Sequence, residues 1–166
     1  MKHKKGFMGD ALFNIVYLFF IGIFIISFYM IISNIDTIWS SNPDIPEQSK
    51  NIFGRYADRF AATNDSMFLL ITIGFMIAIV VSAILIRSHP VFGVIAIIIM
   101  IVFVAASIYI TNSFREFTSN SEIGSYALDF PMMTTIINNL PKFALFMMVV
   151  FIIVLFAKGK QGSGTI

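Results

Sequence analysis

The sequence lacks cysteine and has few charged residues. None of its 166 residues is a cysteine, which excludes disulfide bonds, thiolate nucleophiles and zinc or iron–sulfur sites built on cysteine. Only 12% of the residues are charged, whereas 58% are hydrophobic, and the mean hydropathy is +0.89. Soluble domains have a more even balance of apolar and polar residues. The composition therefore predicts a protein of the membrane.

Residue patterns for catalysis or metal binding are also missing. The two histidines, His3 and His89, stand beside lysine, arginine and proline instead of acidic residues, so local spacing builds neither a zinc motif nor a nucleophile–base pair. The glycine-rich stretch 159–164 follows an apolar run and precedes no helix, which a phosphate-binding loop requires. A net charge of +2 is too small for a nucleic-acid-binding surface. We expect no enzyme activity, no catalytic, cofactor-binding or metal-binding residues, no cofactor and no nucleic-acid partner.

Four apolar runs predict helices that cross a bilayer. A hydrocarbon core of about 30 Å requires roughly 20 helical residues. The uncharged runs are Ala11–Ser33, Met67–Ile86, Val91–Ile110 and the shorter Phe143–Ala157. Lys142 and Lys158 bracket the last run and can extend their ammonium groups to the two membrane interfaces. The predicted fold class is an all-α integral membrane protein with four transmembrane helices, forming one membrane domain over residues 1–166.

The two longer connections carry helical patterns of their own. Ile52, Tyr56 and Phe60 recur at helical spacing, which predicts a short amphipathic helix over residues 46–62. This helix either lies on the bilayer surface or docks a partner. In the second connection Pro131 interrupts the pattern, so we expect two short interfacial helices within residues 121–140. Alternatively, Met132–Leu140 extends the last span inward as a kinked helix.

Several residues are predicted to anchor the chain at the membrane surface or to contact a partner. The short connection between the second and third runs contains Arg87 and His89, and Arg87 can donate to lipid phosphate or to a neighbouring chain. Trp39, the only tryptophan, follows the first run, where an indole ring prefers the headgroup layer. Lys142 and Lys158 complete this set.

The distribution of lysine and arginine predicts the topology. Cations without matching acids gather at the two chain ends and in the short connection around Arg87, whereas the two longer connections hold most of the acidic residues. Because lysine and arginine resist translocation, the cationic side is the cytoplasmic one. We therefore expect an integral membrane protein with both termini on the cytoplasmic side.

The predicted spans contain small residues but no ionisable ones. Gly74, Ala78 and Ser82 recur at every fourth position of the second run, a ridge that lets another helix approach closely. Its partner is either Ala96 or the 105–107 cluster of the next run, or a second copy of the chain. The absence of charge inside the runs speaks against proton-coupled or ion-coupled carriers, which hold a carboxylate at membrane depth.

One resemblance to a known group of proteins lies in the second half of the chain. It rests on the stretches Arg87–Phe92, Thr111–Phe114, Phe130–Pro131 and Asn138–Pro141, ahead of a short span ending at Lys158. In these features the chain resembles small multispanning membrane proteins of membrane-containing icosahedral phages and related viruses. The resemblance implies a structural role in the lipid vesicle beneath a capsid, and it carries over no catalytic residue.

We therefore expect a non-enzymatic structural protein that shapes a viral membrane or tethers it to the capsid. The expected partners are membrane lipids, further copies of the chain, and capsid or other membrane proteins. The sequence also allows two alternative functions. One is a holin-like protein that oligomerises through the ridge of Gly74, Ala78 and Ser82 and forms pores, and the other is an accessory subunit of a host membrane complex.

Overall fold

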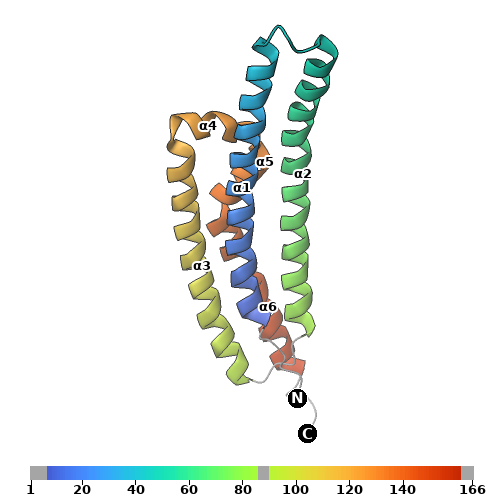
Figure 1. Cartoon of the computed structure of the whole chain (residues 1–166). Helices are drawn as coiled ribbons and strands as arrows, with labels where there is room; N and C mark the ends of the chain where they lie inside the picture. The colour runs from blue at the N-terminus through green and yellow to red at the C-terminus, as the bar shows by residue number, and fades with distance from the viewer. Residues whose placement is uncertain (1–6, 86–89, 162–166) are drawn as a thin grey trace, which may run out of the picture.

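A computed structural model describes residues 7–85 and 90–161, and within these ranges the chain is all-helical. Figure 1 shows a bundle of long helices with two short helices at one end. The helices are α1 (Phe7–Ser41), α2 (Glu47–Leu85), α3 (Pro90–Ser119), α4 (Ser121–Ala127), α5 (Pro131–Asn138) and α6 (Leu140–Gln161).

Three helices are long and apolar enough to cross a membrane, and a fourth span exists if a bent pair counts as one. The three are within α1, α2 and α3, and the bent pair is α5 with α6, whose axes differ by 60° at a break around Asn139. These helices fit a membrane-embedded protein. The expectation of four spans therefore depends on whether α5 and α6 together form one span. α6 itself runs for 22 residues and is longer than the 143–157 run.

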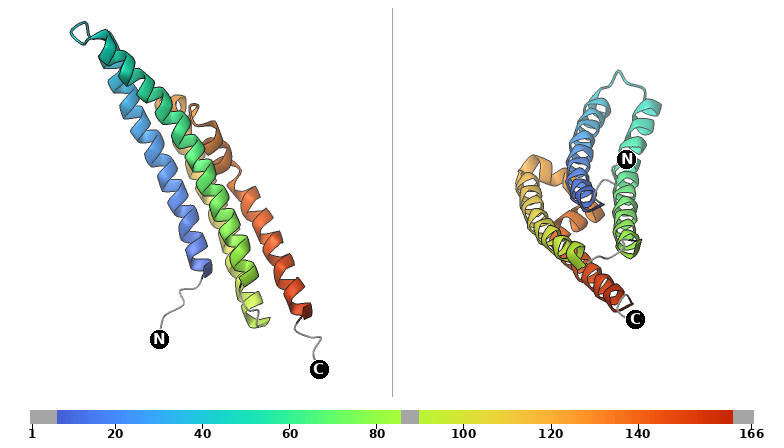
Figure 2. Two further views of the ribbon diagram at one scale, coloured as in Figure 1. Left: turned by 90° about the vertical axis from the view of Figure 1, so that its right-hand side faces the viewer. Right: turned by 90° about the horizontal axis from the view of Figure 1, so that it is seen from below.

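The long helices pack as two antiparallel pairs. α1 packs along α2 and α3 packs along α6, while α1 also contacts α3 and α2 also contacts α6. Figures 1 and 2 show which helix ends lie together at one end of the bundle. They are the start of α1, the end of α2, the start of α3 and the end of α6. The loop between α1 and α2 and the short helix α4 lie toward the other end, which we call the outer end.

The short helix predicted over residues 46–62 is not a separate element. Those residues are the outer part of α2, which continues without a break through Thr63–Ser66 into the apolar run. The polar side chains at this junction support the continuation, because Asn64 Nδ2 donates to Phe60 O at 2.8 Å and Ser66 Oγ donates to Ala62 O at 2.9 Å. Such bonds satisfy short polar side chains on their own helix. The helix predicted in the first connection is therefore present as part of α2, and its position at the membrane interface stays a prediction.

As a result, α1 and α2 form a hairpin longer than the rest of the bundle. At 1.5 Å per residue, the 35 residues of α1 extend about 52 Å, well beyond a hydrocarbon core of about 30 Å. Figure 1 shows both helices rising past α4 at the outer end. There Trp39 of α1 packs against Phe53 of α2 with ring centroids 5.0 Å apart, so the only tryptophan also holds the two helices together.

The second connection forms two short helices, as predicted, but one of them is buried. α4 lies across the end of α3, and its second residue is capped by Asn120 Oδ1, which accepts from Glu122 N at 3.1 Å. Gly124 is needed at this turn, since a Cβ there would lie 2.5 Å from Thr118 O. α5 instead buries Met133, Ile136 and Ile137 inside the bundle. The inward extension of Met132–Leu140 is thus closer to the structure than a helix on the outer surface.

Candidate functional site

The most polar part of the buried interior surrounds α5, which is held at both ends by side chains from other helices. α5 is only eight residues long, too short to be stable alone. Its buried face packs against the hydrophobic cluster that contains Ile26, Phe68, Phe114 and Phe130. At its two ends the backbone groups that have no partner within the helix need partners elsewhere.

The N-terminal end of α5 is bound by Asp65 of α2. Asp65 Oδ2 accepts from Met132 N at 3.0 Å, and Oδ1 accepts from Met133 N at 2.7 Å. The preceding residue, Pro131, has no N–H to satisfy, and Thr134 N donates to Phe130 O at 2.9 Å. The first turn of α5 therefore has a partner for every backbone donor. A carboxylate at this position also interacts favourably with the positive end of the helix dipole.

The C-terminal end of α5 is bound by two residues of α3. Pro141 lacks the N–H that would otherwise donate to the carbonyl four residues earlier, at Ile137. Thr111 Oγ1 fills that place and donates to Ile137 O at 2.8 Å. Arg115 Nη2 donates to Asn138 O at 3.4 Å and its Nε donates to Asn138 Oδ1 at 3.3 Å. A cation at the end of α5 complements the negative end of the dipole.

Asp65 precedes the apolar run of α2, and the sequence pattern does not single it out. Only 4% of its surface is exposed, and it lies within the continuous helix α2. Both of its carboxylate oxygens are occupied by backbone donors of α5. Among the described residues, no buried side-chain nitrogen or oxygen lacks a hydrogen-bond partner.

Gly22 on α1 is the close-packing position for α5. A Cβ at Gly22 would lie 3.0 Å from Ile137 Cδ1 and 3.3 Å from Met133 Sδ. The absence of a side chain lets α5 enter between α1, α2 and α3, as small residues allow in membrane bundles.

The predicted ridge of Gly74, Ala78 and Ser82 on α2 is not packed as expected at Gly74. Gly74 and Ala78 are exposed, and within the described part of the chain no atom lies within 4 Å of a Cβ built on Gly74. The packing partner expected from the next span is therefore not found at Gly74. Ser82 lies in α2, but its side chain is outside the described set. A contact between copies of the chain stays a prediction.

The predicted surface anchors lie apart from the buried network. Trp39 is at the outer end of α1, and Lys142 is exposed in the first turn of α6, where its Nζ donates to Asn139 Oδ1 at 2.9 Å. Arg87 and His89 lie outside the described residues. Lys158 lies in α6 near its end, and its side chain is likewise not described. Contacts of these residues with a partner stay a prediction.

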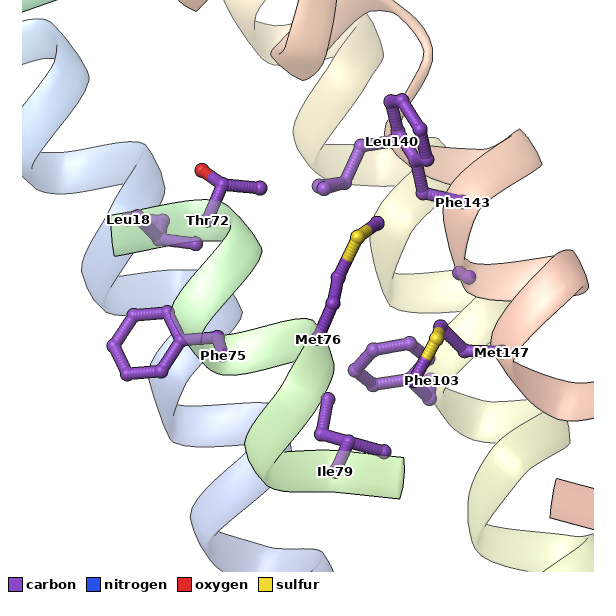
Figure 3. A pocket seen from close by; sticks show the side chains of 10 residues that line it. Leu18, Thr72, Phe75, Met76, Ile79, Phe103, Leu140, Phe143 and Met147 are labelled. Carbon is purple, nitrogen blue, oxygen red and sulfur yellow. The ribbon is translucent and has the colours of Figure 1, made fainter. Parts of the chain in front are cut away.

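Below α5 the four long helices enclose an apolar cavity (Figure 3). Its empty volume is about 420 Å³, including the part open toward the outside. The lining residues are Leu18, Thr72, Phe75, Met76, Ile79, Phe103, Leu140, Phe143, Ala144 and Met147. The single polar member, Thr72, donates its hydroxyl to Phe68 O at 2.8 Å, so its hydrogen-bonding need is met within α2.

The described residues contain no group of three or more histidine, cysteine or acidic side chains that could hold a metal ion. The chemistry available at both places is therefore hydrogen bonding between helices and contact with apolar groups.

No protein-family model matches the chain, and neither a curated protein nor a solved structure is significantly similar to it.

Proposed function

We propose that the chain is a non-enzymatic structural protein that shapes the membrane in which it is embedded. The observation that supports this proposal is the fixed position of α5 between α1, α2 and α3. α5 contacts these helices through Gly22, Asp65 and Thr111, and it lies on the outer side of α6, from which it is bent by 60°. A helix at this angle takes up more width than a straight continuation of α6 would, and a protein that is broader in one leaflet favours curvature of the surrounding bilayer.

The buried polar groups support a structural role because they are used in packing. Asp65 and Thr111 bind the backbone of α5, while Ser107 donates to Val104 O of its own helix at 2.7 Å. A proton or ion carrier instead keeps a carboxylate available to its cargo. The setting that we propose is the internal membrane of a virus, where the protein shapes the vesicle or tethers it to the capsid. This setting rests on the resemblance of the second half of the chain.

Vesicle reconstitution tests the shaping role. The purified protein is added to dioleoyl phosphatidylcholine at increasing protein-to-lipid ratios, and vesicle diameters are measured by electron cryomicroscopy. We expect the mean diameter to fall as the ratio rises. Unchanged diameters over the whole range would contradict the proposal. A density map of the native assembly from its source would test the viral setting, since the neighbours of the protein would be visible.

A pore-forming function is the second candidate, and the exposure of Gly74 and Ala78 favours it. Close helix contacts between copies could form along this open stripe. The same vesicles, loaded with a self-quenched dye, distinguish the two candidates. Dye release that requires Gly74, and is lost in Gly74→Leu, would support the pore. Intact vesicles of reduced diameter would support the shaping role.

A further inference from the structure

We propose that the apolar cavity between α2 and α6 is a binding site for one acyl chain of a membrane phospholipid. The cavity is lined by residues from all four long helices. Six of the lining residues are buried, whereas Phe75, Met76 and Ile79 of α2 and Phe143 of α6 are only half-buried. The cavity therefore opens sideways between α2 and α6, toward the space that lipid occupies around a membrane protein.

The chemistry of the lining suits a hydrocarbon chain and excludes a polar ligand. Figure 3 shows Met76 reaching from α2 toward Leu140 of α6, with Phe103 and Met147 on the far side. In the same view the methyl group of Thr72 faces the cavity while its hydroxyl faces away. Apolar cavities of this kind do not hold water, because water finds no hydrogen-bond partner there. The two methionines have flexible, polarizable side chains that adapt to an occupant.

The size of the cavity distinguishes an acyl chain from a protein partner. A methylene group takes up about 30 Å³, close to the share of a water molecule in the liquid, and the empty volume of about 420 Å³ includes space open toward the outside, so the site takes at most roughly 14 methylenes and encloses only part of an acyl chain. A single turn of α-helix, with a diameter of about 10 Å and a rise of 5.4 Å, already fills a similar volume. A helix of another protein therefore does not fit without separating α2 from α6.

The position of α5 sets the outer limit of the site. Leu140, at the break between α5 and α6, lies at the outer end of the cavity, and above it Thr111 and Arg115 hold the end of α5 in place. A chain that enters between α2 and α6 therefore ends beneath α5. In this arrangement the bound lipid completes the packing between the two helix pairs.

Photolabelling with a lipid probe tests the site. The full-length protein is reconstituted in dioleoyl phosphatidylcholine containing a trace of phosphatidylcholine with a diazirine in one acyl chain, and labelled residues are mapped by mass spectrometry after illumination. We expect label on buried cavity residues such as Phe103 and Met147 in addition to lipid-facing residues such as Leu145. Label confined to lipid-facing residues would overturn the proposal.

A matched pair of variants separates occupancy from general lipid contact. Ala144→Leu places a larger side chain in the cavity, whereas Ala78→Leu makes the same change on the exposed face of α2. Cavity labelling should fall several-fold in the first variant and stay unchanged in the second. Equal labelling of Phe103 in both variants would contradict the proposal. The label map of the unmodified protein decides the question even if Ala144→Leu does not fold.

Discussion

At the scale of single residues, Asp65 explains how a short helix is kept inside an apolar bundle. A helix N-terminus in such surroundings leaves donors that cost free energy unless they are bound. The residue before α5 is Phe130, whose side chain accepts no hydrogen bond there, so the cap must come from another helix. Asp65 supplies it with both oxygens. The charge of Asp65 is therefore part of the packing of the bundle.

Asp65→Asn should destabilise the protein. The amide side chain keeps one acceptor oxygen but places an N–H₂ group against the other backbone donor, so we expect a loss of about 1–3 kcal/mol in the free energy of unfolding. Asp58→Asn is the control, because Asp58 is exposed on the same helix and its change should stay within about 0.5 kcal/mol. Unfolding in sodium dodecyl sulfate, followed by far-ultraviolet circular dichroism, measures both. Equal effects of the two changes would argue against the capping role.

The two glycines Gly22 and Gly74 differ in packing: Gly22 lies against α5, whereas Gly74 is exposed. Gly22→Leu forces a side chain against Ile137 and Met133 of α5, and overpacking of this kind costs about 1–3 kcal/mol. Gly74→Leu meets open space in the described structure and should leave stability within about 0.5 kcal/mol of the parent protein. The same unfolding titration compares the two.

A stable Gly74→Leu variant also tests self-association. If copies of the chain meet along the stripe of Gly74 and Ala78, cross-linking between copies in membranes should decrease in this variant while folding is retained. Unchanged cross-linking would exclude this stripe as the contact. If Gly74→Leu lost as much stability as Gly22→Leu, Gly74 would also be a close-packing position, and the contrast between the two glycines would be wrong.

At the scale of helices, the sequence predicts the apolar runs but not where each helix ends. Apart from Ile86, which lies outside the described residues, the four runs fall within α1, α2, α3 and α6, because hydropathy reports the apolar length directly. The polar residues at Thr63–Ser66 resemble a membrane boundary, yet α2 continues through them. Contacts with α1 and α5 determine that the helix continues here, and the local sequence pattern carries no information about those contacts.

The burial of α5 was only one of two alternatives for the same pattern. The stripe of Met133, Ile136 and Ile137 indicates an amphipathic helix, but it does not say whether bilayer or protein covers the apolar face. Pro131 and Pro141 hold a further signal. Each marks a helix end where backbone groups need partners, and the search for those partners points to Asp65, Thr111 and Arg115.

Thr111→Val should weaken the end of α5. The variant keeps the shape of the side chain but removes the donor to Ile137 O, which then has no proline N–H to replace it. Hydrogen bonds between membrane helices contribute about 0.6 to 1.7 kcal/mol, and we expect a loss in that range. Infrared spectroscopy of protein with a ¹³C-labelled carbonyl at Ile137 should show a shift to higher frequency. Thr63→Val, at an exposed position of α2, should produce neither effect, and an unshifted band in Thr111→Val would contradict the bond.

At the scale of the whole molecule, the bundle is asymmetric along its length. The inner end consists of α1, α2, α3 and α6, whereas toward the outer end α5 takes the place of α6, α4 lies across the end of α3, and the hairpin of α1 and α2 extends beyond them (Figure 1). The membrane thickness covers only part of α1 and α2. We therefore expect the outer hairpin, with exposed Arg55, Asp58 and Arg59, to lie in the aqueous phase or headgroup layer.

The side of the membrane on which the outer end lies can be measured directly. Ser41 and Ser119 end α1 and α3 at the outer end and are exposed. The distribution of cations predicts that this end faces away from the cytoplasm. Since the sequence contains no cysteine, single cysteines placed at Ser41, Ser119 and Ser163 can be labelled without background. In intact cells an impermeant maleimide should react at the first two positions and not at Ser163.

Each other labelling pattern has a distinct structural meaning. Labelling of Ser163 alone would invert the topology while preserving four spans. Labelling of Ser41 and Ser119 together with Ser163 would place both ends of α6 on one side, so that α5 and α6 would enter and leave the membrane on the same face. Labelling of only one of Ser41 and Ser119 would contradict the bundle itself, because α1 and α3 end on the same side of it.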